Sequence, residues 1–233
     1  MAARGSQTTV EHAQTERRHA MVAGQIETRG IRDPDVLSAL RTVPRHLFVP
    51  AGVADQAYDD SALAIGYGQT ISQPYIVALM TVLAEVNVRS RVLEVGSGSG
   101  YQTAVLAELA GEVYTIERRR ELEERARLAL QRLGYHNVTS VLGDGSLGLP
   151  EQAPFDRIVV TAAAPQAPPP LLEQLADGGR LVVPIGPAGS DQVLTVITRT
   201  PVGLSEVESI PCRFVPLVGA SGFREPGDEE PGP

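Results

Sequence analysis

Three glycines at alternate positions, Gly96, Gly98 and Gly100, follow a short apolar run and precede a new helical pattern. Glycine permits positive φ and lets a ligand approach the backbone without meeting a Cβ, so this loop is typical of a nucleotide-binding turn. A dinucleotide-binding fingerprint instead has the spacing G-x-G-x-x-G and holds a pyrophosphate. The observed spacing, with Glu94 inside the preceding strand, therefore predicts a ligand that has no pyrophosphate.

Two acidic residues follow the next predicted strands and could contact a nucleoside. Glu117 lies about twenty residues beyond Gly96, the separation at which an acid can accept hydrogen bonds from both ribose hydroxyls. Asp144 lies between two glycines, where its carboxylate could accept a hydrogen bond from an exocyclic amine. Taken singly, Glu117 is slightly better explained as a solvated acid at a helix start and Asp144 as an ordinary turn residue. Because the small residues 161–165 follow a fourth strand at the same expected edge, a nucleoside pocket is the better joint explanation.

A second polar cluster, residues 65–75, contains Ser72 between glycines and an apolar helical pattern. Ser72 could be a helix N-cap, with Pro74 in the first turn and the Tyr75 amide donating to its hydroxyl. It could also be a working residue, and its position alone leaves both roles open.

The elements that must position these residues alternate between strands and helices. The predicted strands cover residues 91–95, 112–116, 138–142, 157–161 and 180–184, and the predicted helices cover residues 101–110, 119–133 and 170–176. Repeated strand and helix units of this length predict an α/β fold with a doubly wound, mostly parallel sheet. Residues 192–200 and 205–217 are predicted to add antiparallel strands at the C-terminal edge.

A small helical region is predicted before the sheet, with helices over residues 16–28 and 34–40. Asp33 is the expected N-cap of the second helix, with Pro34 at its first position. The acidic, Pro- and Gly-rich tail, residues 224–233, is expected to be disordered.

Composition limits the possible partners. A net charge of −8 argues against a general affinity for nucleic acid or anionic membrane. The single cysteine, Cys212, excludes an internal disulfide and multi-cysteine metal sites. Since no apolar run approaches about 18 residues and no apolar leader is apparent, we expect a soluble, cytoplasmic protein.

Five short motifs define a resemblance to a known family. They are Gly30-Ile31-x-Asp33, Val43-Pro44-Arg45-x-x-Phe48-Val49-Pro50, Ile65-Gly66-x-Gly68-Gln69-Thr70-Ile71-Ser72-Gln73-Pro74, Leu93-Glu94-Val95-Gly96-Ser97-Gly98-Ser99-Gly100-Tyr101-Gln102-Thr103 and Arg213-Phe214-Val215-Pro216-Leu217. In these motifs the chain closely resembles bacterial protein-L-isoaspartate O-methyltransferases, from about Arg18 to Phe223. The resemblance implies S-adenosylmethionine as methyl donor, with S-adenosylhomocysteine as product. The implied acceptor is the α-carboxylate of L-isoaspartyl residues in damaged proteins and peptides.

The resemblance also implies roles for individual residues. Ser72 matches the family's active-site serine and would orient the acceptor carboxylate by a hydrogen bond. The implied cofactor-binding residues are Gln69, Thr70, Ile71, Glu94, Gly96, Ser97, Gly98, Gly100, Glu117, Asp144 and Gly145. The implied substrate-binding residues are Ser72, Arg213, Phe214 and Val215. No metal is expected.

The implied fold is a Rossmann-like S-adenosylmethionine methyltransferase sheet. We expect a flexible N-terminus (1–15), a helical region with the active-site loop (16–75), the methyltransferase domain (76–223) and the acidic tail (224–233). We also expect a monomer. Two other functions stay open here, namely a methyltransferase of this fold with a small-molecule acceptor and a nucleotide-binding module that has lost its chemistry.

A carboxylate acceptor would explain why no catalytic histidine stands out. Its pKa of about 3.5 leaves it ionised at neutral pH, so it needs no general base. We expect surface or packing roles for His12, His19, His46 and His136.

Overall fold

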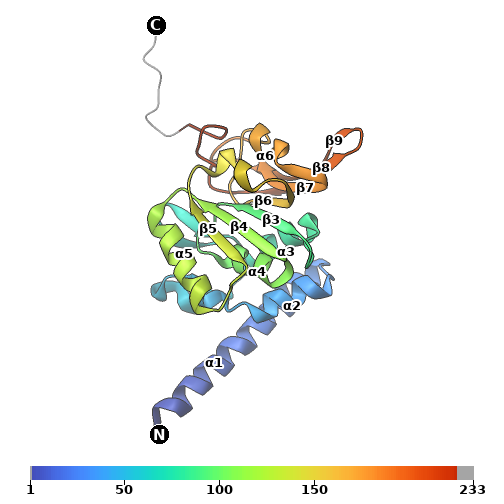
Figure 1. The fold of residues 1–233 in the computed structure, drawn as a ribbon. Helices are drawn as coiled ribbons and strands as arrows, with labels where there is room; N and C mark the ends of the chain where they lie inside the picture. The colour runs from blue at the N-terminus through green and yellow to red at the C-terminus, as the bar shows by residue number, and fades with distance from the viewer. Residues whose placement is uncertain (1, 225–233) are drawn as a thin grey trace.

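The computed structural model describes residues 2–224, with side chains described for residues 11–224 (Figure 1). Its main helices and strands are α1 (Ala2–Met21), α2 (Pro34–Thr42), β1 (Leu63–Gly66), β2 (Gln69–Ile71), α3 (Pro74–Ala84), β3 (Arg91–Val95), α4 (Tyr101–Leu109), β4 (Glu112–Glu117), α5 (Arg120–Arg132), β5 (Val138–Leu142), β6 (Phe155–Val160), α6 (Pro169–Glu173), β7 (Leu175–Ile185), β8 (Gln192–Thr200) and β9 (Gly203–Cys212). Of the tail predicted to be disordered, residues 224–233, all but Arg224 lie outside the described residues.

The large sheet has seven strands in the order β5-β4-β3-β6-β7-β8-β9. Strands β3 to β7 pair in parallel, and β8 and β9 add two antiparallel pairings at the edge. This confirms the predicted doubly wound, mostly parallel fold. The chain runs outward from β3 to β5 and then returns to β6 on the other side of β3. The strand order therefore reverses at β3, which is where open α/β sheets bind their ligands.

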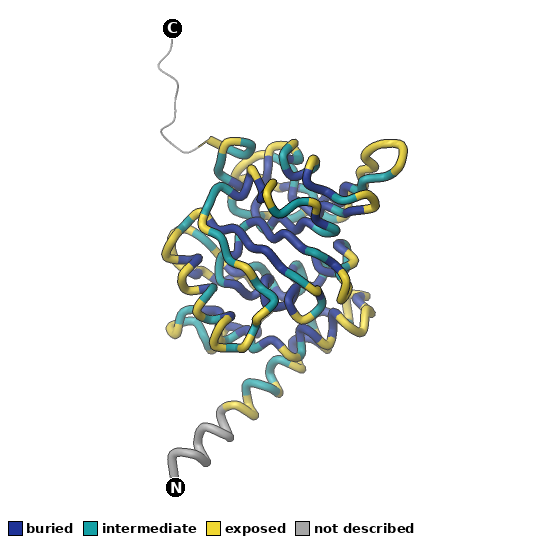
Figure 2. Tube along the Cα trace, in the orientation of Figure 1, coloured by how far each residue is buried: buried dark blue, intermediate teal, exposed yellow. Residues whose placement is uncertain are grey.

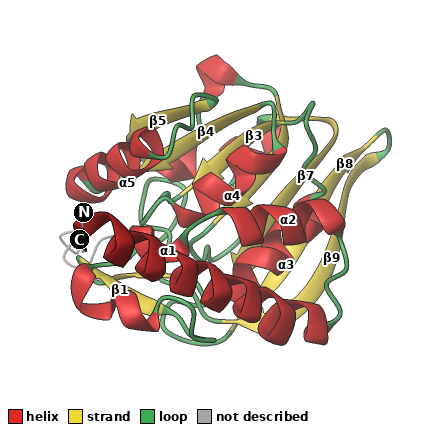
Figure 3. Ribbon diagram, turned by 90° about the horizontal axis from the view of Figure 1, so that it is seen from below, coloured by secondary structure: helices red, strands yellow, loops and turns green. Residues whose placement is uncertain are grey.

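The two faces of this sheet pack against different layers, because successive strand side chains point to opposite faces. Val92 of β3 packs with α3 and α4, whereas its neighbour Leu93 packs with α6 on the other face. Figure 3 looks onto the layer that contains α2, α3 and α4. Figure 2 shows the central strands as the buried interior, with an exposed connection between β8 and β9.

The N-terminal region lies outside α3 and α4 and shares a buried apolar cluster with α4 and α5. Met21 and Leu40 belong to the same cluster as Tyr101 and Leu130. The predicted Asp33 cap of α2 is confirmed, because its Oδ1 accepts hydrogen bonds from the amides of Asp35 and Val36, each 3.0 Å long.

The first predicted helix differs in extent from the observed one. Instead of one helix over residues 16–28, α1 begins at Ala2, and a π-helical turn (Val22–Ile26) and a 3-10 turn (Glu27–Arg29) follow it. The wider π-turn lies where Val22 and Ile26 enter the core. The polar sequence before residue 16 has no apolar periodicity that would indicate this early start. The flexibility expected for residues 1–15 stays a prediction.

A short hairpin, β1 and β2, was not predicted from the sequence. Its turn has positive φ at both Tyr67 (55°) and Gly68 (70°), as a two-residue turn of this kind requires. The hairpin packs over the glycine loop, where the position of a Cβ on Gly98 lies 3.6 Å from Ile65 Cδ1. Arg125 of α5 holds it by donating to the Ile65 carbonyl at 3.0 Å. Since β2 ends at Ile71, the hairpin delivers the next residue to the same edge of the sheet.

The last predicted strand, 205–217, is wrong in its second half. Strand β9 ends at Cys212, and residues 213–217 leave the β8 ladder. They run beside the end of β6 instead, where the Ala163 amide donates to the Val215 carbonyl (2.8 Å) and the Leu217 amide donates to the Ala163 carbonyl (2.7 Å). The Phe214 amide donates to the Gln192 side chain at 2.8 Å, which ends the pairing with β8.

Candidate active site

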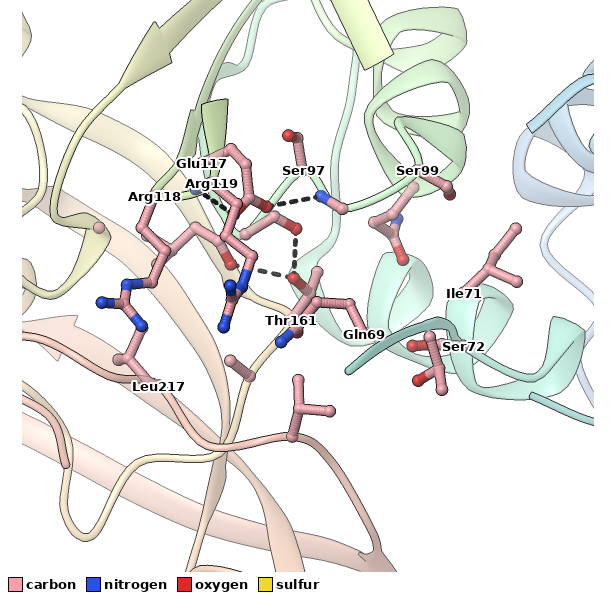
Figure 4. A pocket seen from close by; sticks show the side chains of 18 of the residues that line it. Gln69, Ile71, Ser72, Ser97, Ser99, Glu117, Arg118, Arg119, Thr161 and Leu217 are labelled. Atoms are coloured by element: carbon pink, nitrogen blue, oxygen red, sulfur yellow. Dashed lines mark hydrogen bonds between the residues drawn. The ribbon is translucent and has the colours of Figure 1, made fainter. Parts of the chain in front are cut away.

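A cavity of about 380 Å³ lies at the carboxyl ends of β3, β4 and β6, at the reversal of strand order (Figure 4). The glycine loop, the β1–β2 hairpin, the end of β4 and residues 215–218 form its walls. Ten of the sequence-predicted site residues line it: Gln69, Thr70, Ile71, Ser72, Gly96, Ser97, Gly98, Glu117, Gly145 and Val215. The fold therefore brings together most of the residues that the sequence indicated.

The glycine loop needs its glycines for backbone geometry. Gly96, Gly98 and Gly100 all have positive φ, at 95°, 52° and 87°. A Cβ on Gly96 would lie 2.5 Å from Thr161 Oγ1. That hydroxyl lies within hydrogen-bonding distance of the carbonyls of Gly96 (2.5 Å) and Val95 (3.0 Å), and its single proton can be donated to either. Thr161 thus fixes the loop against the end of β6.

Gly100 has a packing role in the structure and does not line the cavity. It is the N-cap of α4, and a Cβ there would lie 3.1 Å from the Cβ of Ala126 on α5. The third glycine therefore allows α4 and α5 to pack closely.

Ser97 has a buried hydroxyl that makes no hydrogen bond in the described part of the chain. Its side chain lines the cavity but is only 4% exposed. A buried hydroxyl without a partner costs free energy, so its place on the wall fits a polar ligand group.

Glu117 lines the cavity from the end of β4 and is 7% exposed. One carboxylate oxygen accepts from the Gly98 amide (3.0 Å) and the other from the Arg119 amide (2.9 Å). Each oxygen can accept a second hydrogen bond, so the side chain can still receive two hydroxyls of a ligand. Figure 4 shows Glu117 and Ser72 far apart across the pocket.

Glu94 is fully buried behind the glycine loop and does not line the cavity. Its Oε2 accepts from Thr103 Oγ1 (2.5 Å) and Thr115 Oγ1 (2.6 Å), whereas Oε1 has no partner in residues 11–224. Burial raises the pKa of the Glu94 carboxyl to about 7, and the two threonine hydroxyls oppose that shift. Glu94 therefore lies at the back of the loop, with no wall contact of its own.

The Asp144 carboxylate accepts hydrogen bonds from other residues of the protein, and Asp144 does not line the cavity. Its Oδ1 accepts from the amide and hydroxyl of Ser146, at 2.9 and 2.7 Å. Its Oδ2 accepts from the Ala220 amide at 2.8 Å. Asp144 thus joins the loop after β5 to the C-terminal segment, while Gly145 lies on the wall.

Ser72 directly follows β2 and is partly exposed. The capping alternative for it is wrong: Gln73 is the N-cap of α3, and no side-chain hydrogen bond caps this helix. In the described part of the chain, the Ser72 hydroxyl has no hydrogen-bond partner, so it is available to a ligand.

A second cavity of about 360 Å³ adjoins the first. The two cavities share Thr70, Ser72, Thr161 and Val215 as lining residues. Arg213 and Phe214, which the sequence indicated as substrate-binding residues, line this second cavity only. The predicted site residues thus divide between two adjoining spaces that meet at Ser72.

The rim of the second cavity carries paired charges. Asp60 lines it, forms an ion pair with Arg29 and accepts a hydrogen bond from Gln73 Nε2 at 2.8 Å. Arg213 pairs with Asp191 at 2.9 Å, and both side chains are largely exposed. Cys212 also lines this cavity, and burial raises the pKa of its thiol to about 11, so it stays protonated at neutral pH.

Several wall residues were missed by sequence reasoning. Tyr67 belongs to the unpredicted hairpin, whereas Arg118 and Arg119 follow Glu117 at the end of β4. Because ligands bind beyond the carboxyl ends of parallel strands, the position of the two arginines directly after β4 could have indicated that they line the site. Thr161 was noted as a small residue, but its hydrogen bonds to the glycine loop depend on the tertiary fold.

Other features of the described residues bear on the expected roles. His46 Nδ1 lies 2.7 Å from the Tyr58 hydroxyl, and His12 pairs with Glu16 on α1, both outside the two cavities. Residues 11–224 contain no group of three or more His, Cys, Asp or Glu side chains arranged to hold a metal. None of the helices described is both long and apolar enough to cross a membrane.

Comparison with known proteins gives a consistent match over most of the chain. Residues 16–222 match the family model for "Protein-L-isoaspartate(D-aspartate) O-methyltransferase (PCMT)". The protein-L-isoaspartate O-methyltransferase of Synechococcus sp. (strain JA-2-3B'a(2-13)) is 54% identical over 207 residues, covering 86% of this chain and 85% of that protein. The protein of the same name from Opitutus terrae is 54% identical over 208 residues and 89% of each chain.

Two solved structures share the fold. One, a protein-L-isoaspartate O-methyltransferase, superposes with a TM-score of 0.80 at 29% identity, covering 89% of this chain and 67% of that one. The other is a putative enzyme of the same kind from Plasmodium falciparum in complex with S-adenosyl-L-homocysteine. It superposes with a TM-score of 0.75 at 27% identity, covering 86% of this chain and 98% of that one.

Proposed function

Because the chain belongs to the protein-L-isoaspartate O-methyltransferase family, we propose that its two adjoining cavities are the donor and acceptor halves of one active site. The protein is an S-adenosylmethionine-dependent carboxyl O-methyltransferase. It methylates the α-carboxylate of L-isoaspartyl residues in damaged proteins and so initiates their repair. The family match does not favour a small-molecule acceptor or a binding module without chemistry.

The observation that carries the two-part site is the position of Ser72. This residue lines both cavities, and its hydroxyl has no hydrogen-bond partner in residues 11–224. A group at the junction of the two spaces can contact an acceptor while the donor occupies the other space.

The cavity at the glycine loop has groups that fit the donor. Gly96, Ser97 and Gly98 would hold the methionine part, with the unpartnered Ser97 hydroxyl available to its polar end. Glu117 would accept hydrogen bonds from the ribose, and Gly145 would border the adenine. Asp144 would support this border from behind, through its bonds to Ser146 and Ala220. S-adenosylmethionine, when bound, supplies a methyl group on a sulfonium centre.

Glu94 has a supporting role in this proposal. It lies behind the glycine loop and holds Thr103 of α4 and Thr115 of β4 through its Oε2. It would therefore act on the donor through the shape of the loop, together with the packing of Gly100 against α5. Gln69, Thr70 and Ile71 would close the donor cavity from the hairpin.

The second cavity would receive the isoaspartyl peptide along residues 213–215. An extended peptide held by backbone hydrogen bonds tolerates varied side chains, as a repair enzyme requires. The acceptor carboxylate, with a pKa of about 3.5, is ionised at neutral pH, so the chain need not supply a base. Ser72 would donate a hydrogen bond that orients this carboxylate. Positioning of this kind contributes about 7 to 11 kcal/mol in well-oriented intramolecular reactions.

The family indicates a protein substrate, and we propose the finer assignments for partners and location. The protein would act as a cytoplasmic monomer that binds neither nucleic acid nor membrane. Its net charge of −8 supports the lack of binding to nucleic acid and membrane, because a strong negative charge repels phosphate backbones and anionic lipid surfaces.

Ser72→Ala tests the proposed junction. The variant loses one hydrogen bond to a charged group, so kcat/KM for an isoaspartyl peptide should fall about tenfold to a hundredfold. Affinity for S-adenosylhomocysteine, measured by calorimetry, should stay close to that of the wild type. Ser205→Ala, on the exposed strand β9, is the matched control and should retain full activity. Unchanged turnover in Ser72→Ala would overturn the assignment, as would a loss of affinity equal to the loss of turnover.

A further inference from the structure

Arg45, from the motif Val43-Pro44-Arg45, is a buried cation that the proposed chemistry does not use. It begins a 3-10 turn (Arg45–Phe48), and its side chain is 0% exposed. Among the residues whose side chains are described, it has no carboxylate partner, and its Nη1 has no hydrogen-bond partner at all. Burying an unpaired charge is costly, so an arginine at this position requires an explanation.

The contacts of Arg45 join three segments that are distant in sequence. Its Nε donates to the Ala57 carbonyl at 2.7 Å, and its Nη2 donates to the Ser72 carbonyl at 2.8 Å. The guanidinium carbon lies 4.8 Å from the centre of the Tyr101 ring, within the range of a cation–π contact. Phe48 holds the same ring from another side, edge-on at 5.8 Å.

These contacts connect the two halves of the active site. Ser72 lies at the junction of the cavities, and Tyr101 is the first residue of α4, directly after the glycine loop, and lines the donor cavity. Arg45 lines neither cavity, so any effect on the acceptor must pass through these neighbours.

The chemistry of the contacts requires the guanidinium group. Its planar fork donates in two directions while its central carbon lies over an aromatic ring, which a lysine ammonium cannot reproduce. Burial lowers the pKa of Arg45 to about 10, so the group is still protonated at neutral pH. A permanent donor is therefore directed at the Ser72 carbonyl throughout the physiological range.

We propose that Arg45 is a positioning residue that fixes the backbone of Ser72 against the donor half of the site. By holding the Ser72 carbonyl while it lies on the Tyr101 ring, it sets the distance between the acceptor-orienting hydroxyl and the glycine loop. This inference rests on the role proposed for Ser72 and adds a residue that touches neither substrate nor cofactor.

Arg45→Lys tests the inference, with Arg41→Lys as matched control. Arg41 also lies in the N-terminal region, but it is partly exposed and bonds to Glu27 at 2.9 Å. For Arg45→Lys, kcat/KM with an isoaspartyl peptide should fall at least about tenfold, because the variant loses a hydrogen bond that a charged group donates to the Ser72 carbonyl. Affinity for S-adenosylhomocysteine should stay near the wild-type value, and Arg41→Lys should behave as the wild type.

A double-mutant cycle separates positioning from a general loss of stability. If Arg45 acts through Ser72, Arg45→Lys should add little further loss in the Ser72→Ala background. The inference is overturned if Arg45→Lys alone keeps wild-type kcat/KM. It is also overturned if Arg45→Lys lowers kcat/KM by the same factor in the Ser72→Ala variant as in the wild type. If instead Ser72→Ala by itself leaves kcat/KM unchanged, the role proposed for Ser72 is wrong. That result is distinct from an Arg45→Lys variant that keeps wild-type kcat/KM while Ser72→Ala loses activity, which would refute the role of Arg45 alone.

A measurement on the unmodified protein covers the case in which Arg45→Lys does not fold. In NMR spectra of protein with nitrogen-labelled arginine, the Arg45 Nη2–H signal, which reports the hydrogen bond to the Ser72 carbonyl, should shift when an isoaspartyl peptide is added with S-adenosylhomocysteine. The aspartyl twin of that peptide should leave the signal in place. Absence of a shift with the isoaspartyl peptide would overturn the inference.

Discussion

At the scale of single residues, the surroundings of Glu94, Glu117 and Asp144 separate three acids that the sequence grouped together. Glu94 lies inside a strand, and Glu117 and Asp144 lie at or after the ends of strands, but Glu117 is the one whose side chain lines the donor cavity. Glu94 points into the core toward two threonines, and Asp144 is used by Ser146 and Ala220. Strand and loop patterns predict where such residues lie, whereas the direction of each carboxylate depends on partners that are distant in sequence.

The position of Glu117 predicts a loss of donor affinity on substitution. Glu117→Gln removes the negative charge and replaces one of the two carboxylate oxygens that would accept hydrogen bonds from the ribose hydroxyls, so S-adenosylhomocysteine should bind about tenfold more weakly in calorimetry. Glu121→Gln, an exposed acid in the first turn of α5, is the control and should bind normally. Equal affinity in both variants would contradict the ribose assignment.

The burial of Glu94 predicts a pH dependence of stability in the cofactor-free protein. Its pKa is raised from 4.5 in the unfolded chain to about 7 in the fold, so the folded state favours the protonated carboxyl. This contribution to stability is fully present below the unfolded pKa and is lost as the pH rises through the folded one. Between the two values, the free energy of unfolding should fall by about 1.4 kcal/mol per pH unit from this group.

Glu94→Gln should remove that slope, because the amide is neutral throughout and its oxygen can still accept from Thr103 and Thr115. Urea unfolding at about pH 5 and pH 8 would measure the difference between the two proteins. Parallel pH dependence in wild type and variant would show that Glu94 does not carry a raised pKa.

At the scale of elements, the parallel strands could be predicted closely, because their apolar runs alternate with helical patterns. Strands β3, β5 and β8 have the predicted bounds. The β1–β2 hairpin could not be predicted, since its strands are short and Tyr67 takes a positive φ that its residue type does not signal. Residues 213–217 have a strand-like composition but find their hydrogen bonds at Ala163, a partner that only the tertiary fold supplies.

The glycine loop provides a test at this scale. A Cβ on Gly96 would meet Thr161 Oγ1 at 2.5 Å, whereas a Cβ on Gly68 would meet no atom within 4 Å, although both glycines have positive φ. Gly68→Ala should therefore cost about 1 to 2 kcal/mol from backbone strain alone. Gly96→Ala should cost about 1 to 3 kcal/mol more from overpacking, and it should also weaken S-adenosylhomocysteine binding. Chemical denaturation measures the free energy of unfolding of both variants. Equal losses of stability would contradict the close packing of the glycine loop against Thr161.

At the scale of the whole molecule, the site exists because the N-terminal region closes over the sheet. The β1–β2 hairpin brings Ser72 to the carboxyl ends of β3 and β6, and the C-terminal segment reaches the same place. The sequence indicated most of these residues but not that they line two cavities that share one wall. Arg45 is a further example, because its motif was visible but its contact with Ser72 requires the folded chain. The division of the chain at residues 75 and 223 stays a prediction.

The central claim is that this two-part site methylates isoaspartyl carboxylates. Its most direct test is transfer of tritiated methyl groups from S-adenosylmethionine to an isoaspartyl peptide and to its aspartyl twin, with purified wild-type protein. The two peptides have the same composition and charge and differ only in which carboxylate of one residue is free. We expect methylation of the isoaspartyl peptide and none of its twin. Failure to methylate the isoaspartyl peptide, or equal methylation of both, would contradict it.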